Sequence, residues 1–113
     1  MTMTEDEIAN VSRAVASRFE MRLRPMVQEL SVLLAPALGA RMRHLRPSTS
    51  MRVIAEWMHE ERGAPASSLD WVEWVMAIED ATSSQMVDEF ANDIEERSFG
   101  EVVEHLCGHR RTA

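Results

Sequence analysis

The chain has 113 residues, of which 45% are hydrophobic and 27% are charged, an ordinary composition for one folded domain with a modest core. The longest uncharged apolar run covers residues 32–40, far short of the roughly 20 residues that a membrane-spanning helix needs. No signal peptide is recognised, and the single cysteine, Cys107, cannot form an internal disulfide. We therefore expect a single cytoplasmic domain over residues 1–113, with no membrane association.

The net charge of −7 is distributed unevenly along the chain. Residues 1–46 carry seven Arg and five acidic residues, a net of +2, whereas residues 47–113 carry five Arg and fourteen acidic residues, a net of −9. A negative field of this kind repels the phosphates of a nucleic acid and suits a basic partner, such as the surface of a DNA-binding protein. The alternative is a solvated helix face that keeps the protein soluble. We expect no nucleic acid as a partner.

An apolar side chain recurs every three or four positions across residues 5–45, which is the period of an α-helix. The stripe consists of Ile8, Val11, Val15, Phe19, Leu23, Met26, Leu30, Leu33 and Ala37. This segment forms either a helical hairpin or one long, bent helix, opened by a capping box at Thr4. Because the stripe stays in phase through Pro25, we expect a kink there and a second interruption at Pro36, with the arm ending near His44.

Capping signals predict shorter helices after this arm. A helix over about residues 50–62 has three possible N-caps at 48–50 and a stop at Gly63. Ser67 with Asp70 forms a second capping box. The helix that it opens is apolar nearly all round, which predicts a position in the middle of the fold.

The last part of the chain repeats the same pattern. Hydroxyl side chains at residues 82–84 are expected to cap another helix, and Ser98 with Glu101 forms a third internal capping box. The final helix ends at Gly108, and we expect residues 109–113 to be frayed. No segment alternates with the period of a strand. The prediction is an all-α helical bundle, with a long kinked N-terminal helical arm and about four shorter helices.

No group of residues forms a complete catalytic or metal-binding signature. Glu56 and His59 make a single Glu-x-x-His pair, whereas di-iron proteins use two such pairs and two further glutamates. His105, Cys107 and His109 are close in sequence, but no second ligand pair accompanies them. We therefore expect no enzyme activity, no metal or other cofactor, and no small-molecule substrate.

What remains is an interaction surface. Nine Met and three Trp accompany the long stripe; methionine surfaces adapt to partners, and Trp is enriched at binding hot spots. The alternative is that all of them form the core, but a chain this small has difficulty covering so long a stripe alone. We therefore predict a homodimer that buries the arm, or binding to a protein partner. The interface residues that we predict are Phe19, Met26, Leu30, Leu33, Trp57, Trp71 and Trp74.

Three segments carry a resemblance to a known family: MTMTEDEIANVSRAVASRF, EWMHEERGAP and the Trp-rich segment from Leu69. With them the whole chain resembles quorum-sensing anti-activators of the QslA type. The resemblance implies a small, acidic, all-helical homodimer that binds a LuxR-type transcription factor such as LasR. It also implies that the protein occupies the ligand-binding domain of that factor and so prevents its dimerisation and its binding to DNA.

Two other classes of function stay open at this point. One is a helical adaptor or scaffold that assembles a larger protein complex without inhibiting anything. The other is a small enzyme or metal protein whose site the sequence does not reveal.

Overall fold

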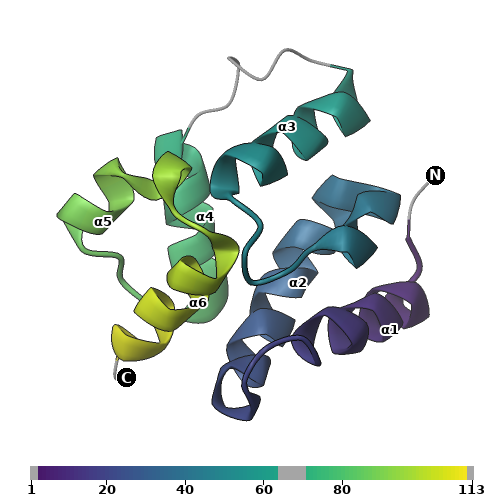
Figure 1. Ribbon diagram of the computed structural model, residues 1–113, viewed down its shortest axis with the longest axis horizontal. Helices are drawn as coiled ribbons and strands as arrows, with labels where there is room; N and C mark the ends of the chain where they lie inside the picture. Colours follow the sequence, from purple (N-terminus) through teal and green to yellow (C-terminus); the bar gives the residue numbers. More distant parts are fainter. Residues whose placement is uncertain (1–2, 64–70, 112–113) are drawn as a thin grey trace.

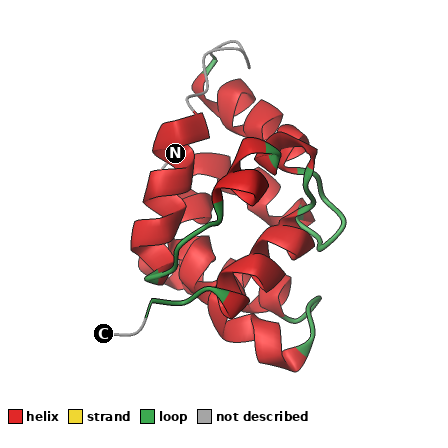
Figure 2. Cartoon of the chain, turned by 90° about the vertical axis from the view of Figure 1, so that its left-hand side faces the viewer, coloured by secondary structure: helices red, strands yellow, loops and turns green. Residues whose placement is uncertain are grey.

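The computed structural model describes residues 3–63 and 71–111, and its regular secondary structure is helical (Figures 1 and 2). The α-helices are α1 (Glu5–Ala16), α2 (Arg24–Leu38), α3 (Met51–Arg62), α4 (Trp71–Thr82), α5 (Asp88–Asn92) and α6 (Phe99–Gly108). Short 3-10 helices are η1 (Met21–Leu23), η2 (Gly39–His44) and η4 (Ile94–Glu96). In these ranges the β-type pairing consists of two isolated bridges. The predicted all-α class is confirmed.

Of the two alternatives predicted for the N-terminal arm, a hairpin and a long bent helix, the structure has the hairpin. The kink expected at Pro25 is wrong. The capping box at Thr4 is present, but α1 ends at Ala16 and the chain reverses through residues 17–20. Pro25 lies in the first turn of α2, where its missing N–H is not needed. Arg18 fixes the turn, because its Nη1 donates to the backbone carbonyls of Arg43 and Leu45, each 2.7 Å away.

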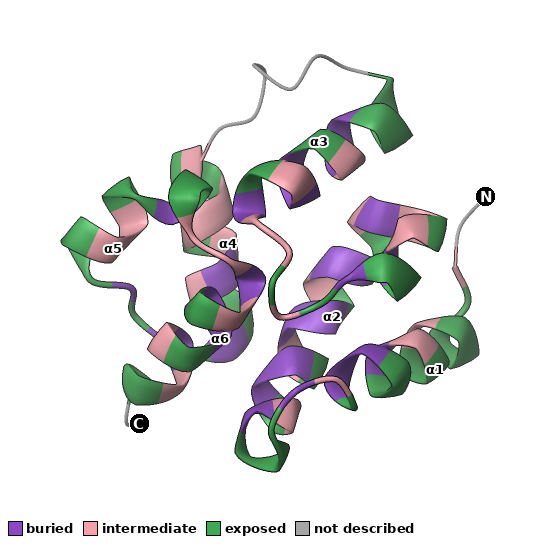
Figure 3. Cartoon of the chain, viewed as in Figure 1, coloured by how far each residue is buried: buried purple, intermediate pink, exposed green. Residues whose placement is uncertain are grey.

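The helix α2 lies at the centre of the molecule. It packs against α1 on one side and against α3, α4 and α6 on others (Figure 1). Seven of its 15 residues are buried, which appears as the most continuous buried stretch in Figure 3. The helix continues through Pro36 and ends at Gly39, which has a positive φ of 57°. The chain then continues as η2 to His44, where the predicted arm ends.

The helix α3 begins and ends as the sequence predicts. Ser50 is the N-cap, with its side chain accepting from the backbone N–H of Val53 at 3.2 Å. Gly63 ends the helix in the left-handed conformation that glycine favours. The predicted capping box of Ser67 and Asp70 lies outside the described residues.

The start of α3 and the start of α6 are joined through their backbones. The N–H of Met51 donates to the carbonyl of Arg97 at 2.8 Å, and the N–H of Phe99 donates to that of Thr49 at 2.7 Å. The N–H of Gly100 donates to the carbonyl of Pro47 at 2.8 Å. A side chain at Gly100 has no room, because its Cβ would lie 2.9 Å from that carbonyl oxygen.

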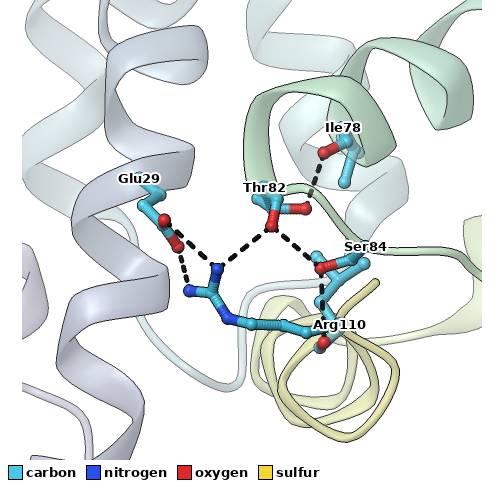
Figure 4. A network of polar contacts seen from close by, with 6 residues as sticks. Glu29, Ile78, Thr82, Ser84 and Arg110 are labelled. Carbon is cyan, nitrogen blue, oxygen red and sulfur yellow. Dashed lines mark hydrogen bonds and ion pairs between the residues drawn. The ribbon is translucent and has the colours of Figure 1, made fainter. Parts of the chain in front are cut away.

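The predicted helix after residues 82–84 is wrong in its start and its length. The N-cap of α5 is Val87, which makes no side-chain cap, and only five residues are helical before Asp93. The hydroxyls instead bond to carbonyls: Thr82 donates to Ile78 at 2.8 Å, and buried Ser84 lies 3.2 Å from the carbonyl oxygen of Thr82 (Figure 4). These hydroxyls therefore order a loop and do not open a helix.

The expectation of a frayed tail is wrong for residues 109–111, whereas residues 112–113 lie outside the described part. The N–H of Arg111 donates to the carbonyl of Ser83 at 2.7 Å, so the tail pairs with the loop after α4. The guanidinium of Arg110 forms an ion pair with Glu29 of α2 and donates to the carbonyl of Thr82 at 3.2 Å (Figure 4). The tail thus ties together the ends of α4 and α6 and the side of α2.

Replacing Gly100 with Ala tests the close approach of α6 to residue 47. The added Cβ must displace the Pro47 carbonyl, and such overpacking costs about 1–3 kcal/mol of the free energy of unfolding. Urea unfolding followed by circular dichroism measures this cost as a lower midpoint. Gly108→Ala is the matched control, since no atom lies within 4 Å of its added Cβ; equal midpoints for the two variants would contradict the packing.

Candidate protein-interaction surface

Three of the predicted interface residues belong to the core of the single chain. Phe19, Met26 and Leu30 expose 5%, 1% and 1% of their surface. The turn at residues 17–20 points Phe19 inward, where its ring packs edge-on against Phe99 at a centroid distance of 5.6 Å. Met26 and Leu30 have almost no accessible surface while the chain stays folded, which speaks against an interface role for them, and Phe19 offers a partner only the small exposed part of its ring that lines a groove beside α6.

The other four predicted residues are partly exposed, and the structure brings two of them together. Leu33 and Trp74 line a groove of about 460 Å³ between α2 and α4, with Glu61 and Arg62 from the end of α3 at its edge. Pro36 and Ala37 complete its wall. Trp57 on α3 and Trp71 at the start of α4 pack partly against the core, and neither lines this groove.

The side of α4 that faces away from α2 is apolar and exposed. Val72 exposes 69% of its surface and Met76 59%, and the two are one helical turn apart. On α2, Val32 exposes 68%. We call these three residues, with those of the groove on the same two helices (Leu33, Pro36, Ala37 and Trp74), the α2–α4 surface. The prediction that this helix lies in the middle of the fold is wrong, because among the described residues only Ile78 and Thr82 of α4 are buried.

Sequence reasoning missed the exposed members of this surface. Val32 stands off the apolar stripe, and this position outside the stripe was the available signal for an exposed side chain. For Val72 and Met76 the signal was present but misread. A helix that is apolar all round needs neighbours on every side, and among the described residues the main helix packed against α4 is α2.

A second and larger groove, of about 840 Å³, lies between the turn at residues 17–20, residues 47–48 and α6. Its apolar lining includes Phe19, Leu23 and Phe90, and its polar lining includes Glu20, Glu101 and Glu104. We call it the α6 groove. It lies on elements other than those that line the groove of the α2–α4 surface.

The carboxylates of the α6 groove are held by arginines. Arg22 reaches Glu104 at 2.5 Å and Glu20 at 3.1 Å, and the hydrogen bond and charge of Glu104 raise the pKa of Arg22 above its ordinary value. Glu101 accepts from the backbone of Ser98 and from Arg97, and these two interactions lower the pKa of the Glu101 carboxyl. Both groups stay charged at neutral pH, so the groove has a polar, ion-paired rim over an apolar floor.

The residues considered for chemistry do not converge. Glu56 is exposed whereas His59 is buried, and the rings of His105 and His109 stack on each other with centroids 4.1 Å apart. Burial raises the pKa of the Cys107 thiol, which keeps it protonated and weakly nucleophilic at neutral pH. Within residues 3–63 and 71–111, no three His, Cys, Asp or Glu side chains are placed to hold a metal ion.

Comparisons with known proteins leave the family open. The chain matches no family model, no curated protein and no solved structure. None of the helices in the described ranges combines the length and the apolar content that crossing a membrane demands. The resemblance to anti-activators stays a prediction, and the function has to be argued from the surfaces above.

Two neighbouring positions on α2 test the division between core and surface. Leu30→Asp puts a carboxylate into the buried core and should lower the free energy of unfolding by roughly 3–5 kcal/mol. Val32→Asp places the same charge in water and should change it by less than about 0.5 kcal/mol. Urea unfolding of both variants gives these values, and a small effect at Leu30 would show that its side chain is not in the core.

Proposed function

We propose that the protein is a non-enzymatic regulator that binds a transcription factor and removes it from DNA without contacting the DNA itself. The observation that carries this proposal is the exposed apolar side of α4 at Val72 and Met76, together with the groove that Leu33 and Trp74 line between α2 and α4. Exposed apolar surface of this kind marks sites where proteins bind one another. Trp74 in the groove and Met76 on the exposed side of α4 can each serve as a buried anchor of an interface.

The charge of the chain supports the same proposal. Its acidic second part repels DNA and attracts a basic regulator, which accelerates their encounter at low salt. Of the carboxylates that the structure describes in this second part, all but that of Glu79 are exposed, and exposed charges add little affinity. Affinity comes from the apolar anchors, so we expect salt to slow association far more than it speeds dissociation.

The resemblance in sequence indicates the kind of regulator. We propose a LuxR-type receptor such as LasR as the target, with loss of its dimerisation as the cause of its release from DNA, and the cytoplasm as the place where this occurs. We also propose a homodimer. An interface of standard size buries about 1,600 Å² in total, and the α2–α4 surface is the apolar area from which two copies can build it.

A helical adaptor is the second candidate. The observation in its favour is that the small chain carries at least two grooves on different elements, one between α2 and α4 and one beside α6. Two such surfaces allow two different partners to be held at once.

A gel-shift titration tests the proposed function. A LuxR-type regulator is bound to its promoter DNA, and this protein is added in increasing amounts. The regulator–DNA band should disappear near stoichiometric addition, and this protein with DNA alone should give no shifted band. A supershifted ternary band would favour the adaptor, and an unchanged regulator–DNA band would contradict the anti-activator.

Charge variants locate the surface in the same assay. Met76→Asp should raise the concentration needed for release at least about tenfold, since an unpaired carboxylate in an apolar contact costs more than about 1.4 kcal/mol. Met21→Asp is the matched control, because Met21 exposes 77% of its surface in η1, away from the α2–α4 surface. If the two variants release the regulator from DNA at equal concentrations, Met76 does not belong to the interface.

A further inference from the structure

The short helix α5 is held to the rest of the molecule by few side chains. None of its five residues is buried, and its main neighbour is the adjoining η4. Phe90 is only partly buried, and Val87, just before the helix, exposes 48% of its surface. A segment with so little buried apolar area has a low free energy of local opening. A single contact can therefore decide whether α5 stays packed against α6, which we call the closed state.

The contact that holds α5 to α6 is centred on His105. The ring of Phe90 stacks on the His105 imidazole at a centroid distance of 3.9 Å, with 9° between their planes. The guanidinium of Arg97 lies 4.8 Å from the centre of the Phe90 ring. The backbone N–H of Val87 donates to Nε2 of His105 at 3.1 Å. One imidazole thus supplies both a stacking face and a hydrogen-bond acceptor to the start of α5.

The hydrogen bond requires a neutral imidazole with Nε2 free of a proton. When Nε2 is protonated it becomes a donor, and two N–H groups then face each other across the contact. Burial lowers the pKa of His105 below its ordinary value, and the charges of His109 and Arg97 act in the same direction. In the closed arrangement the fold therefore favours the neutral form.

The carboxylates around His105 are held elsewhere. Glu101 accepts from Arg97 and from the backbone of Ser98, and Arg22 pairs with both Glu104 and Glu20 across the α6 groove. Asp93 lies 3.9 Å from Arg97. Two further acids, Asp88 and Glu89 on α5, are exposed to water, which screens their field. Among the described residues, these carboxylates are engaged by other partners or exposed to water and do not contact the His105 ring, whereas the Arg97 guanidinium lies beside the stack.

We propose that protonation of His105 releases α5 from α6, so that the Phe90 wall of the α6 groove opens under mildly acidic conditions. The proposal concerns the fold itself and does not depend on the proposed function. Phe90 and His105 both line the α6 groove, so the release changes the shape of this groove and exposes an aromatic ring there.

The direction of the pH dependence follows from linkage. Because the pKa of His105 is lower in the closed state than its ordinary value of about 6.5, the stabilisation is complete above that value. It is lost as the pH falls towards the pKa of the closed state. In that interval the equilibrium constant for opening rises by at most about tenfold per pH unit for one proton.

Hydrogen exchange at the Val87 amide, followed by NMR on the full chain, measures the opening. After correction for the intrinsic exchange rate, protection should fall several-fold between about pH 7.5 and about pH 5.5. In His105→Gln the amide oxygen can accept at both pH values, so protection there should be independent of pH. His44→Gln, at an exposed histidine in η2, is the matched control and should keep the wild-type response.

Two results would overturn the proposal. One is equal corrected protection of the wild-type amide at both pH values, and the other is the same fall in His105→Gln as in the wild type. A second measurement needs no variant: the midpoint of the Val87 protection curve should coincide with the NMR titration of the His105 ring. Coincidence with the ring of His109 alone would also contradict the assignment.

Discussion

The burial of α2 is the constraint on which the rest of the structure depends. Its buried face is nearly continuous from Met26 to Leu38, and α1, α3, α4 and α6 each cover a part of it. Because these neighbours come from the whole length of the chain, the turn at residues 17–20 and the backbone bridge of Ser50 with Ser98 position the helices that cover α2. Within residues 3–63 and 71–111, the helices that cover α2 leave Val72 and Met76 of α4 exposed.

Much of the fold was predictable because its signals are local. The caps at Thr4, Ser50 and Ser98 and the stop at Gly63 each act within one helical turn, so the sequence alone shows them. The sequence allowed a hairpin but did not place its turn, because Val15, Phe19 and Leu23 have the same spacing in a hairpin as in a straight helix. Proline near the start of a helix was the overlooked signal. The buried hydroxyl of Ser84 bonds to the carbonyl of Leu106 and the carbonyl of Ser83 accepts from Arg111, and no local pattern reveals these long-range contacts.

The candidate site was predictable in kind but only partly in position. Composition indicated a protein-binding surface, and Leu33 and Trp74 do line a groove. Periodicity cannot tell whether a stripe is covered by its own chain or by a partner, which is why Phe19, Met26 and Leu30 were assigned to an interface and lie in the core. For α4 the opposite error occurred. The helix was predicted to be buried because it is apolar nearly all round, yet Val72 and Met76 are exposed to water. Once both corrections are made, the largest exposed apolar side chains near the predicted interface residues of α4 are Val72 and Met76.

The central claim is that a second copy of the same chain covers the exposed side of α4 in the free protein. Light scattering at micromolar concentration tests it most directly. The account predicts a wild-type mass of twice the 12.9 kDa of one chain, and a return to the single-chain mass in Met76→Asp without loss of helical content. A wild-type protein that stays at 12.9 kDa across the micromolar range would contradict it.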